Sequence, residues 1–321
     1  MPGRSYVAGN FQLVLDGVKC GFIKSLDGGA ITADVVSETV GSSHFSKKHI
    51  SRINYTPFVV QFGMSMTRDL YDWINASLTG KAITKDGAII MADVNLMAVS
   101  QREFSRALIT EVNFPALDGT SKEAAYFTLT FAPEYTRTTK ASGKLSTPGK
   151  TEQKLGVSSN FRLAIDGLDC SRVSRVGAIT IKQSISTDDI GVERDHLREP
   201  GKIEFPNLTV TMSEMSAQSW LDWFDDFVVK GNNDESKEKS GSISLLAANL
   251  VDELMRIDLL NLGIFRIGPD KTEANQDQIA TVTAHLYCER MELHAGGEKP
   301  AIVRATGVKT RRASSRRRSR R

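Results

Sequence analysis

The sequence has few cysteines and no long apolar run. Only three cysteines occur among its 321 residues, too few for a disulfide framework, and no CxxC pair points to zinc. No apolar stretch approaches the roughly 20 residues that a membrane-spanning helix needs, and none follows Arg4 as a secretory signal would require. We therefore expect a chain that is made in a cytoplasm and does not insert into a membrane.

Motifs of known catalytic and cofactor sites are also missing. The patterns GxSxG, GxxxxGKS/T, GxGxxG and HExxH do not occur, and the five histidines are scattered. The acidic pairs at 188–189 and 225–226 are explained by a polar loop and by the solvated outer face of a helix. We predict no catalytic, cofactor-binding or metal-binding residues, no cofactor and no enzymatic activity.

The net charge of +3 is unevenly distributed. Residues 309–321 hold eight basic residues and no acidic one, which leaves a formal charge of −5 on the other 308 residues. A run of like charges interleaved with serines cannot bury apolar surface, so we expect it to be disordered in the free chain. Either it tethers the protein to nucleic acid or an acidic protein surface, or it is a solvated tail without a specific role. Its arginines are Arg311, Arg312, Arg316, Arg317, Arg318, Arg320 and Arg321.

The chain contains an internal repeat. Residues 10–20, NFQLVLDGVKC, return as NFRLAIDGLDC at 160–170, and the same offset of 150 aligns Asp72-Trp73 with Asp222-Trp223. A unit of about 150 residues is long enough to form its own core. The repeat predicts two like domains in tandem. We expect the first domain at 1–136, a flexible linker at 137–156, the second domain at 157–300 and a disordered basic tail at 301–321.

Each copy has the pattern of a mostly β domain. Apolar and polar residues alternate from Phe11 to Leu15 and from Phe161 to Ile165, and an Asp-Gly pair follows each run as a hairpin turn. Strands rich in β-branched residues are expected at 31–39 and 179–186. The polar stretches after them are expected to form an extended, exposed hairpin arm or loop.

One amphipathic helix is predicted near the middle of each copy. Thr67 is expected to cap the first helix, and the second is expected to begin at Ser216 or Ser219. Trp73 and Trp223 would anchor the helices as buried core residues. With roughly seven strands per copy, these patterns predict two tandem β-sandwich or barrel domains, each with one flanking α-helix.

The order of these features resembles a known family. In the second copy NFRLAIDGLDC is followed by Pro200-Gly201-Lys202, then PNLTV at 206–210, the Asp222-Trp223 helix and Gly241-Ser242-Ile243. These motifs resemble those of the tube proteins of contractile bacteriophage tails, extracellular contractile injection systems and type VI secretion. The first copy keeps the start and the helix but has RINYTP at 52–57, where the other elements would stand.

The resemblance implies a structural role in the inner tube of a contractile tail or injection system. Six domains would close into a ring by pairing strands, and rings would stack through the loop after the second strand. With two domains per chain, a ring contains three chains, or six chains build a double layer or place one domain outside. The candidate inter-ring contacts are the loop residues Lys47, Lys48, Glu193 and Arg194.

The resemblance also implies partners and a location. The tube would carry DNA or effectors, and a sheath and baseplate or tail-completion proteins would contact it. The protein would assemble in the host cytoplasm and then belong to the virion tail or injection particle. The arginine tail is expected outside the bore, because eight cations would hold passing DNA.

Two other roles stay open from the sequence alone. A tube-initiating, hub or terminating ring would have the same fold and would join a threefold part to a sixfold tube. A protein of another class would bind nucleic acid through the arginine tail, with strongly salt-dependent affinity and no tendency to form rings.

Overall fold

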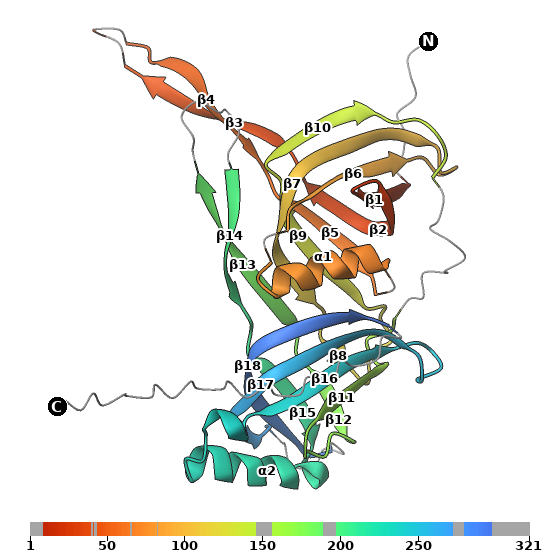
Figure 1. The fold of residues 1–321 in the computed structure, drawn as a ribbon, viewed down its shortest axis with the longest axis vertical. Helices are drawn as coiled ribbons and strands as arrows, with labels where there is room; N and C mark the ends of the chain where they lie inside the picture. The colour runs from red at the N-terminus through yellow and green to blue at the C-terminus, as the bar shows by residue number, and fades with distance from the viewer. Residues whose placement is uncertain are drawn as a thin grey trace, which may run out of the picture.

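The computed structural model describes residues 9–39, 41, 44–64, 66–81, 83–145, 156–188, 197–271 and 279–296. Two mostly β halves follow one another along the long axis of the molecule (Figure 1). In these ranges no helix has both the length and the apolar character needed to span a membrane.

The first half is a closed barrel. Hydrogen bonding runs in the order β7-β6-β1-β2-β5-β9, β9 pairs back with β7, and β10 extends along β7. Every second residue of β5 and β9 is buried, among them Phe58, Phe62, Phe127 and Phe131, so alternation in the sequence supplies the core. The strands are β1 Asn10–Leu15, β2 Val18–Gly28, β5 Phe58–Gly63, β6 Lys85–Ala92, β7 Ala98–Phe114, β9 Tyr126–Ala132 and β10 Tyr135–Lys140.

Glycines set the path of β2. Asp16 has a φ of 46° and Gly17 a φ of 83°, the left-handed pair that a two-residue type I′ hairpin requires. At the other end of β2, a Cβ on Gly28 would lie 1.8 Å from the carbonyl oxygen of Pro57. The strand can therefore approach the start of β5 only because residue 28 has no side chain.

Helix α1 (Arg68–Leu78) packs its apolar face on the first half. Leu70, Trp73 and Ile74 are buried at helical spacing. Thr67 occupies the N-cap position, but its side chain makes no capping hydrogen bond. The helix therefore begins where the sequence predicts, whereas the predicted side-chain cap is not formed.

The second half is an open sheet built from the corresponding strands. Its order is β11-β16-β17-β18-β15-β12-β8, so β11 and β12 stand near opposite ends. In the first half the corresponding strands β1 and β2 pair directly. The strands are β11 Phe161–Ile165, β12 Val173–Val176, β15 Leu208–Ser213, β16 Lys239–Leu246, β17 Glu253–Pro269 and β18 Thr281–Ala295.

The helix of the second half starts between the two predicted serines. Ala217 is its N-cap, and helix α2 (Gln218–Phe224) continues as a π-helical stretch, η2 (Asp225–Val229). Trp220 and Trp223 are its buried residues. Two short 3₁₀ turns flank this region, η1 (Glu214–Ser216) and η3 (Glu235–Lys237).

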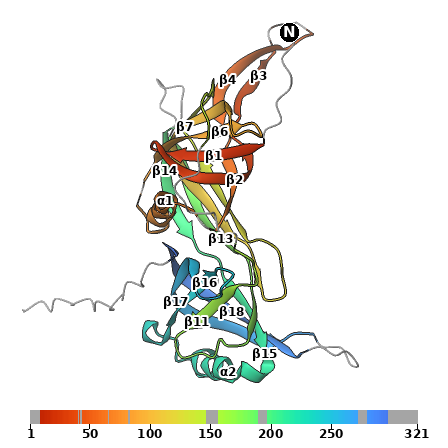
Figure 2. The ribbon, with the colours of Figure 1, turned by 90° about the vertical axis from the view of Figure 1, so that its right-hand side faces the viewer.

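The two halves exchange strands. Strands β13 (Ile179–Asp188) and β14 (Leu197–Glu204) come from the second half, pair as a hairpin and join the first sheet through β7. In return, the short strand β8 (Leu117–Asp118) pairs with β12. The β13–β14 hairpin runs along the first half in Figures 1 and 2. Each half thus completes a sheet of the other.

Strands β3 (Ile31–Glu38) and β4 (Lys47–Tyr55) form a separate two-stranded sheet. This β3–β4 hairpin is the exposed arm that the sequence predicts, and it projects at the end of the first half that lies away from the second (Figures 1 and 2). Every residue of β3 is exposed. The β10 pairing reaches Lys140, inside the segment expected to be a linker from residue 137.

Candidate assembly interface

The main contact between the halves is an antiparallel strand pairing, which we call the β7–β13 joint. It places Ile179, Thr180, Ile181 and Lys182 opposite residues 114, 113, 112 and 111 of β7, respectively. Ile181 is 2% exposed because the joint lays it into the core of the first half. A strand of one domain therefore extends the sheet of the next, which satisfies an edge that would otherwise be open.

Polar side chains cross the β7–β13 joint on the face opposite the core. The Asn113 amide Nδ2 donates to Thr180 Oγ1 at 3.0 Å. Two residues further along β13 on the same face, Lys182 lies directly between Glu111 of β7 and Glu204 of β14. Opposite charges in directly opposed positions favour this register.

The same side of the sheets is rich in hydroxyl groups, and we call it the hydroxyl face. In β9, β15 and β18 the buried residues alternate with threonines. Two of these threonine hydroxyls donate to the Asp270 carboxylate at 2.8 Å, so they are held in place. Its threonines are Thr128, Thr130, Thr180, Thr209, Thr211, Thr281 and Thr283.

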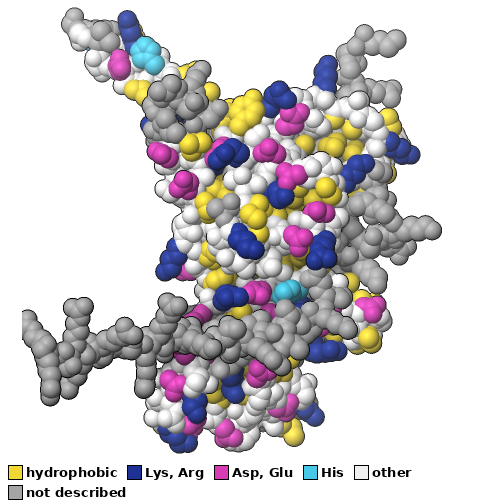
Figure 3. Space-filling model, viewed as in Figure 1, with side chains coloured by type: hydrophobic (Ala, Val, Ile, Leu, Met, Phe, Trp, Pro, Cys, Tyr) yellow, Lys and Arg dark blue, Asp and Glu magenta, His cyan; other side chains and the backbone are white. Residues whose placement is uncertain are grey.

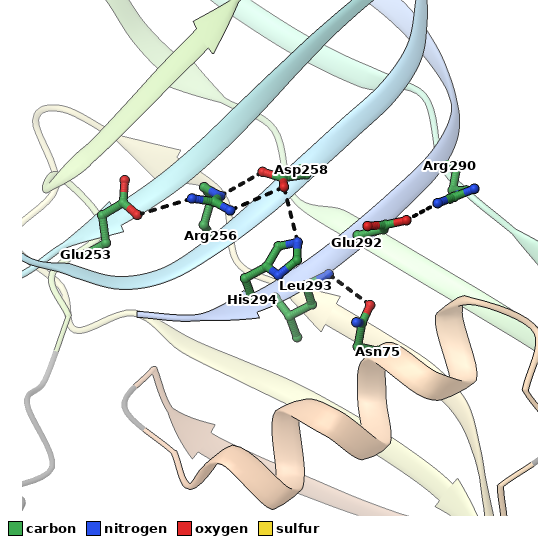
Figure 4. A network of polar contacts seen from close by, with 8 residues as sticks. All are labelled: Asn75, Glu253, Arg256, Asp258, Arg290, Glu292, Leu293 and His294. Atoms are coloured by element: carbon green, nitrogen blue, oxygen red, sulfur yellow. Dashed lines mark hydrogen bonds and ion pairs between the residues drawn. The ribbon is translucent and has the colours of Figure 1, made fainter. Parts of the chain in front are cut away.

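Helix α1 makes a second contact, against β18 of the second half. The Leu293 backbone N–H donates to the Asn75 side chain at 3.4 Å (Figure 4). Close to this point Arg256 is buried, and its Nε donates to Asp258 Oδ1 at 2.8 Å. His294 Nε2 lies 3.1 Å from the other oxygen of Asp258. A buried cation is costly unless paired, so these partners are needed beneath the helix.

A third contact fixes the start of β14. Glu134 is buried and accepts from the Arg198 backbone N–H at 2.8 Å, while Arg106 Nε lies 2.6 Å from its other oxygen. The Arg198 guanidinium donates to the Tyr55 carbonyl at 3.3 Å. Burial lowers the pKa of Arg198. The hairpin of the second half is therefore tied to the first half at both ends.

The predicted inter-ring residues lie away from the β7–β13 joint. Lys47 and Lys48 are exposed at the start of β4. Glu193 and Arg194 are outside the described residues, as are the arginines of the basic tail. In the described part of the chain, no group of three or more His, Cys, Asp or Glu side chains is placed to hold a metal ion.

The predicted helix anchors differ in their surroundings. Trp73 is 1% exposed and its Nε1 donates to the Ile83 carbonyl at 3.1 Å. Trp223 is 8% exposed, with Lys239 Nζ 5.4 Å from its ring centroid. The two tryptophans thus occupy equivalent helix positions with different polar neighbours.

Sequence reasoning did not find the residues of the β7–β13 joint. Glu111, Asn113, Thr180 and Lys182 are polar residues of predicted strands, and nothing local in the sequence names their partner. The available signal was the alternation of apolar and polar residues in the arm strand expected at 179–186, because a strand of a two-stranded hairpin has one edge left without hydrogen bonds. Such a strand requires a sheet from elsewhere.

The fold and the joint define a class of protein: paired mostly β domains that add strands to one another's sheets. A profile of the family described as "T4-like virus tail tube protein gp19" matches residues 7–137 and 157–292, one match for each half. The chain belongs to this tail tube family, as two copies of its domain in tandem. A comparison with curated proteins found no match.

Solved structures of contractile systems have similar chains. A chain of the extended sheath-tube complex of the extracellular contractile injection system PVC is 20% identical, covering 42% of this chain and 88% of that one, with a TM-score of 0.34. A chain of the PVC sheath/tube terminator is 19% identical over 43% and 99%, with a TM-score of 0.39. Hcp1 from Flavobacterium johnsoniae is 13% identical over 43% and 100%, with a TM-score of 0.28.

Proposed function

We propose that the chain is a structural subunit of the inner tube of a contractile tail or injection system. Its domains close into stacked pseudo-sixfold rings around a conduit for DNA or effectors, and its work is mechanical rather than catalytic. The observation that carries the proposal is the β7–β13 joint, in which one tube domain already extends the sheet of the next. A sheet extended in this way has open edges until it closes on itself.

The hydroxyl face is the surface that we assign to the bore. It lies opposite the core on strands of both halves, and Asn113 and Thr180 continue it across the β7–β13 joint. Hydroxyl groups with interspersed charges of both signs offer no strong positive potential that would hold a polyanion. On the face drawn in Figure 3, cations and anions are interspersed among the described residues.

Negative-stain electron microscopy of the purified full-length chain tests this proposal. We expect hollow rings, and short tubes at high protein concentration. Particles of single-chain size at every concentration would contradict it. Tight DNA binding that disappears when residues 309–321 are deleted, without rings, would favour the nucleic-acid-binding alternative instead.

A second role with the same fold is a tube-initiating, hub or terminating ring. It is favoured by the fusion of two domains in one chain, since a ring of three such chains has threefold rather than sixfold symmetry. Copy number in the mature particle separates the roles. A tube subunit is present in many stacked rings, whereas an initiating or terminating protein forms only one or a few.

A further inference from the structure

The two hairpin arms are equivalent parts of the repeat with unequal surroundings. Both carry an irregularity in strand register at the same place, between Ala33 and Val35 in β3 and between Gln183 and Ile185 in β13. The offset of 150 therefore holds through the whole arm. Position 31 of the β3–β4 hairpin corresponds to position 181 of the β13–β14 hairpin.

Burial shows that the β3–β4 hairpin is incomplete. Ile181 is 2% exposed in the β7–β13 joint, whereas Ile31, the same residue type at the equivalent position, is 57% exposed. Val35 and Ile50, which face one another farther along the arm, are 61% and 74% exposed. An isolated two-stranded hairpin with exposed apolar side chains is marginal in water.

Register irregularities also identify the strand that would receive this hairpin. The pairing of β7 with β9 has a register irregularity between Ile109 and Glu111. The pairing of β17 with β18 has one between Ile264 and Arg266. This gives an offset of 155, so that Ile267 corresponds to Val112. The edge of β7 at 111–114 is occupied by β13, whereas at 266–269 the described pairing of β17 is with β18 alone.

The two helices repeat this asymmetry. α1 packs on β18, and its Tyr71 and Leu78 are 3% and 6% exposed. The equivalent residues of the second helix, Leu221 and Val228, are each 41% exposed. Among the described residues, therefore, the face of the second helix that corresponds to the covered face of α1 has no equivalent cover.

The strands of the second half on which α1 packs have an equivalent in the first half, β10 and the part of β7 beside it, and most of β10 is exposed. At the offset of 155, Asp258 of the buried Arg256 cluster corresponds to Glu103, which accepts from Thr139 Oγ1 at 2.9 Å and pairs with Arg137. Arg137 is well exposed, and its hydrogen bonds with Glu103 lower the pKa of that carboxyl group. In the first half, β10 and the part of β7 that pairs with it therefore correspond to the surface of the second half on which α1 packs.

We propose that the β3–β4 hairpin of one copy adds to the 266–269 edge of β17 in a second copy of this chain. Ile31 then lies opposite Ile267 and Thr32 opposite Arg266, and the second helix of this second copy covers β10 of the first copy. This inference rests on the proposed function for the number of domains in a ring. The described part of each chain has one hairpin and one strand edge that are free to pair, so a six-domain ring contains three chains.

The charges at the joint oppose the wrong order of domains. Lys182 faces Glu111 within the chain. If the β13–β14 hairpin added to a second-domain edge instead, Lys182 would face Arg266, and like charges directly opposite one another destabilise a sheet. First and second domains therefore alternate around the ring.

Disulfide trapping tests the proposal. Directly opposed residues of antiparallel strands have Cα atoms about 4.5–5.5 Å apart, which a disulfide spans. We would combine Thr32→Cys with Arg266→Cys in the full-length chain, replace Cys170 by Ser, and oxidise the assembled protein mildly. The matched control pairs Lys182→Cys with Glu111→Cys, which are opposed within one chain.

On a non-reducing gel the test pair should yield a covalent species of three chains, and the control pair should remain at the mass of one chain. A closed species of six chains, or a test pair that stays reduced while the control closes, would overturn the inference. Rings seen by microscopy together with either of those results would leave the proposed function standing. If no variant forms rings and no three-chain species appears, both proposals fail.

Discussion

At the residue scale, Ile31 and Ile181 are equivalent side chains that the proposed assembly buries at two different stages. Both stand at the same point of their arms, and only the arm that has found a sheet edge buries its isoleucine. Burying such a side chain contributes about 1.5–3 kcal/mol. The energy gained by Ile181 in folding is, on this account, gained by Ile31 only when a neighbour arrives.

Ile31→Lys is therefore expected to block ring formation and leave the single chain as stable as before. Stability would be followed by denaturant unfolding and assembly by size-exclusion chromatography. Ile181→Lys is the matched variant, and it should lower the free energy of unfolding by more than about 2 kcal/mol because it buries a charge. Normal rings from Ile31→Lys would show that this side chain stays outside the joint.

Trp73 is predicted to anchor α1. Trp73→Ala should cost about 3–5 kcal/mol, since the side chain is 1% exposed and its loss leaves a cavity. Urea unfolding measures the loss, and Val251→Ala, at a side chain 72% exposed, should change stability by less than about 0.5 kcal/mol. Equal effects of the two substitutions would refute the anchor role.

At the element scale, the sequence predicts the arms but not their destinations. The alternation in β5, β9, β15 and β18 and the Asp-Gly turn after β1 are local patterns, and the strands form where those patterns stand. The partner of β13 is a strand whose paired residues lie some 70 positions earlier in the chain, and no local pattern encodes it. The sequence predicts a hairpin at Asp166-Gly167 as at Asp16-Gly17, and the prediction for the second copy is wrong, because β11 and β12 do not pair whereas β1 and β2 do.

The internal repeat does not keep a single offset along the chain. The offset is 150 through the arms and 155 in the long strands, because the segments after the two helices differ in length. The likeness of Glu103 to Asp258 appears only at the second offset. The residues of the candidate interface could therefore be predicted in part, once the register irregularities showed which positions are equivalent.

The lysines near the tip of the β3–β4 hairpin are predicted to contact the adjacent ring. Replacing Lys47 and Lys48 together by Glu should leave single rings intact and prevent their stacking, because both side chains are exposed. Sedimentation of tubes against rings measures this. The matched variant Lys81→Glu reverses an exposed charge just beyond α1 and should stack normally. Normal tubes from the double variant would exclude these lysines from the stacking contact.

At the scale of the whole molecule, the proposed assembly makes the chain one step of a larger sheet. Its halves exchange β8 for the β13–β14 hairpin. Among the described residues, the β3–β4 hairpin and the 266–269 edge of β17 have no corresponding strand partner. In the proposed ring of three chains, the fusion of two domains makes every second joint intramolecular. Such joints form without the translational and rotational cost of bringing two molecules together.

The basic tail is expected to act outside the bore. A chain that ends at Val308 should form the same rings but lose a salt-sensitive attachment to an acidic partner surface, because eight cations are removed. Co-sedimentation with the sheath at low and high ionic strength measures this. Identical behaviour of the two chains at every salt concentration would show that the tail has no docking role.

The mass of a single ring tests the central claim most directly. Native mass spectrometry or mass photometry of isolated rings should give three times the 35.2 kDa of one chain. A ring of six chains would mean that the two domains lie in separate layers or that one lies outside the wall, and it would contradict the account.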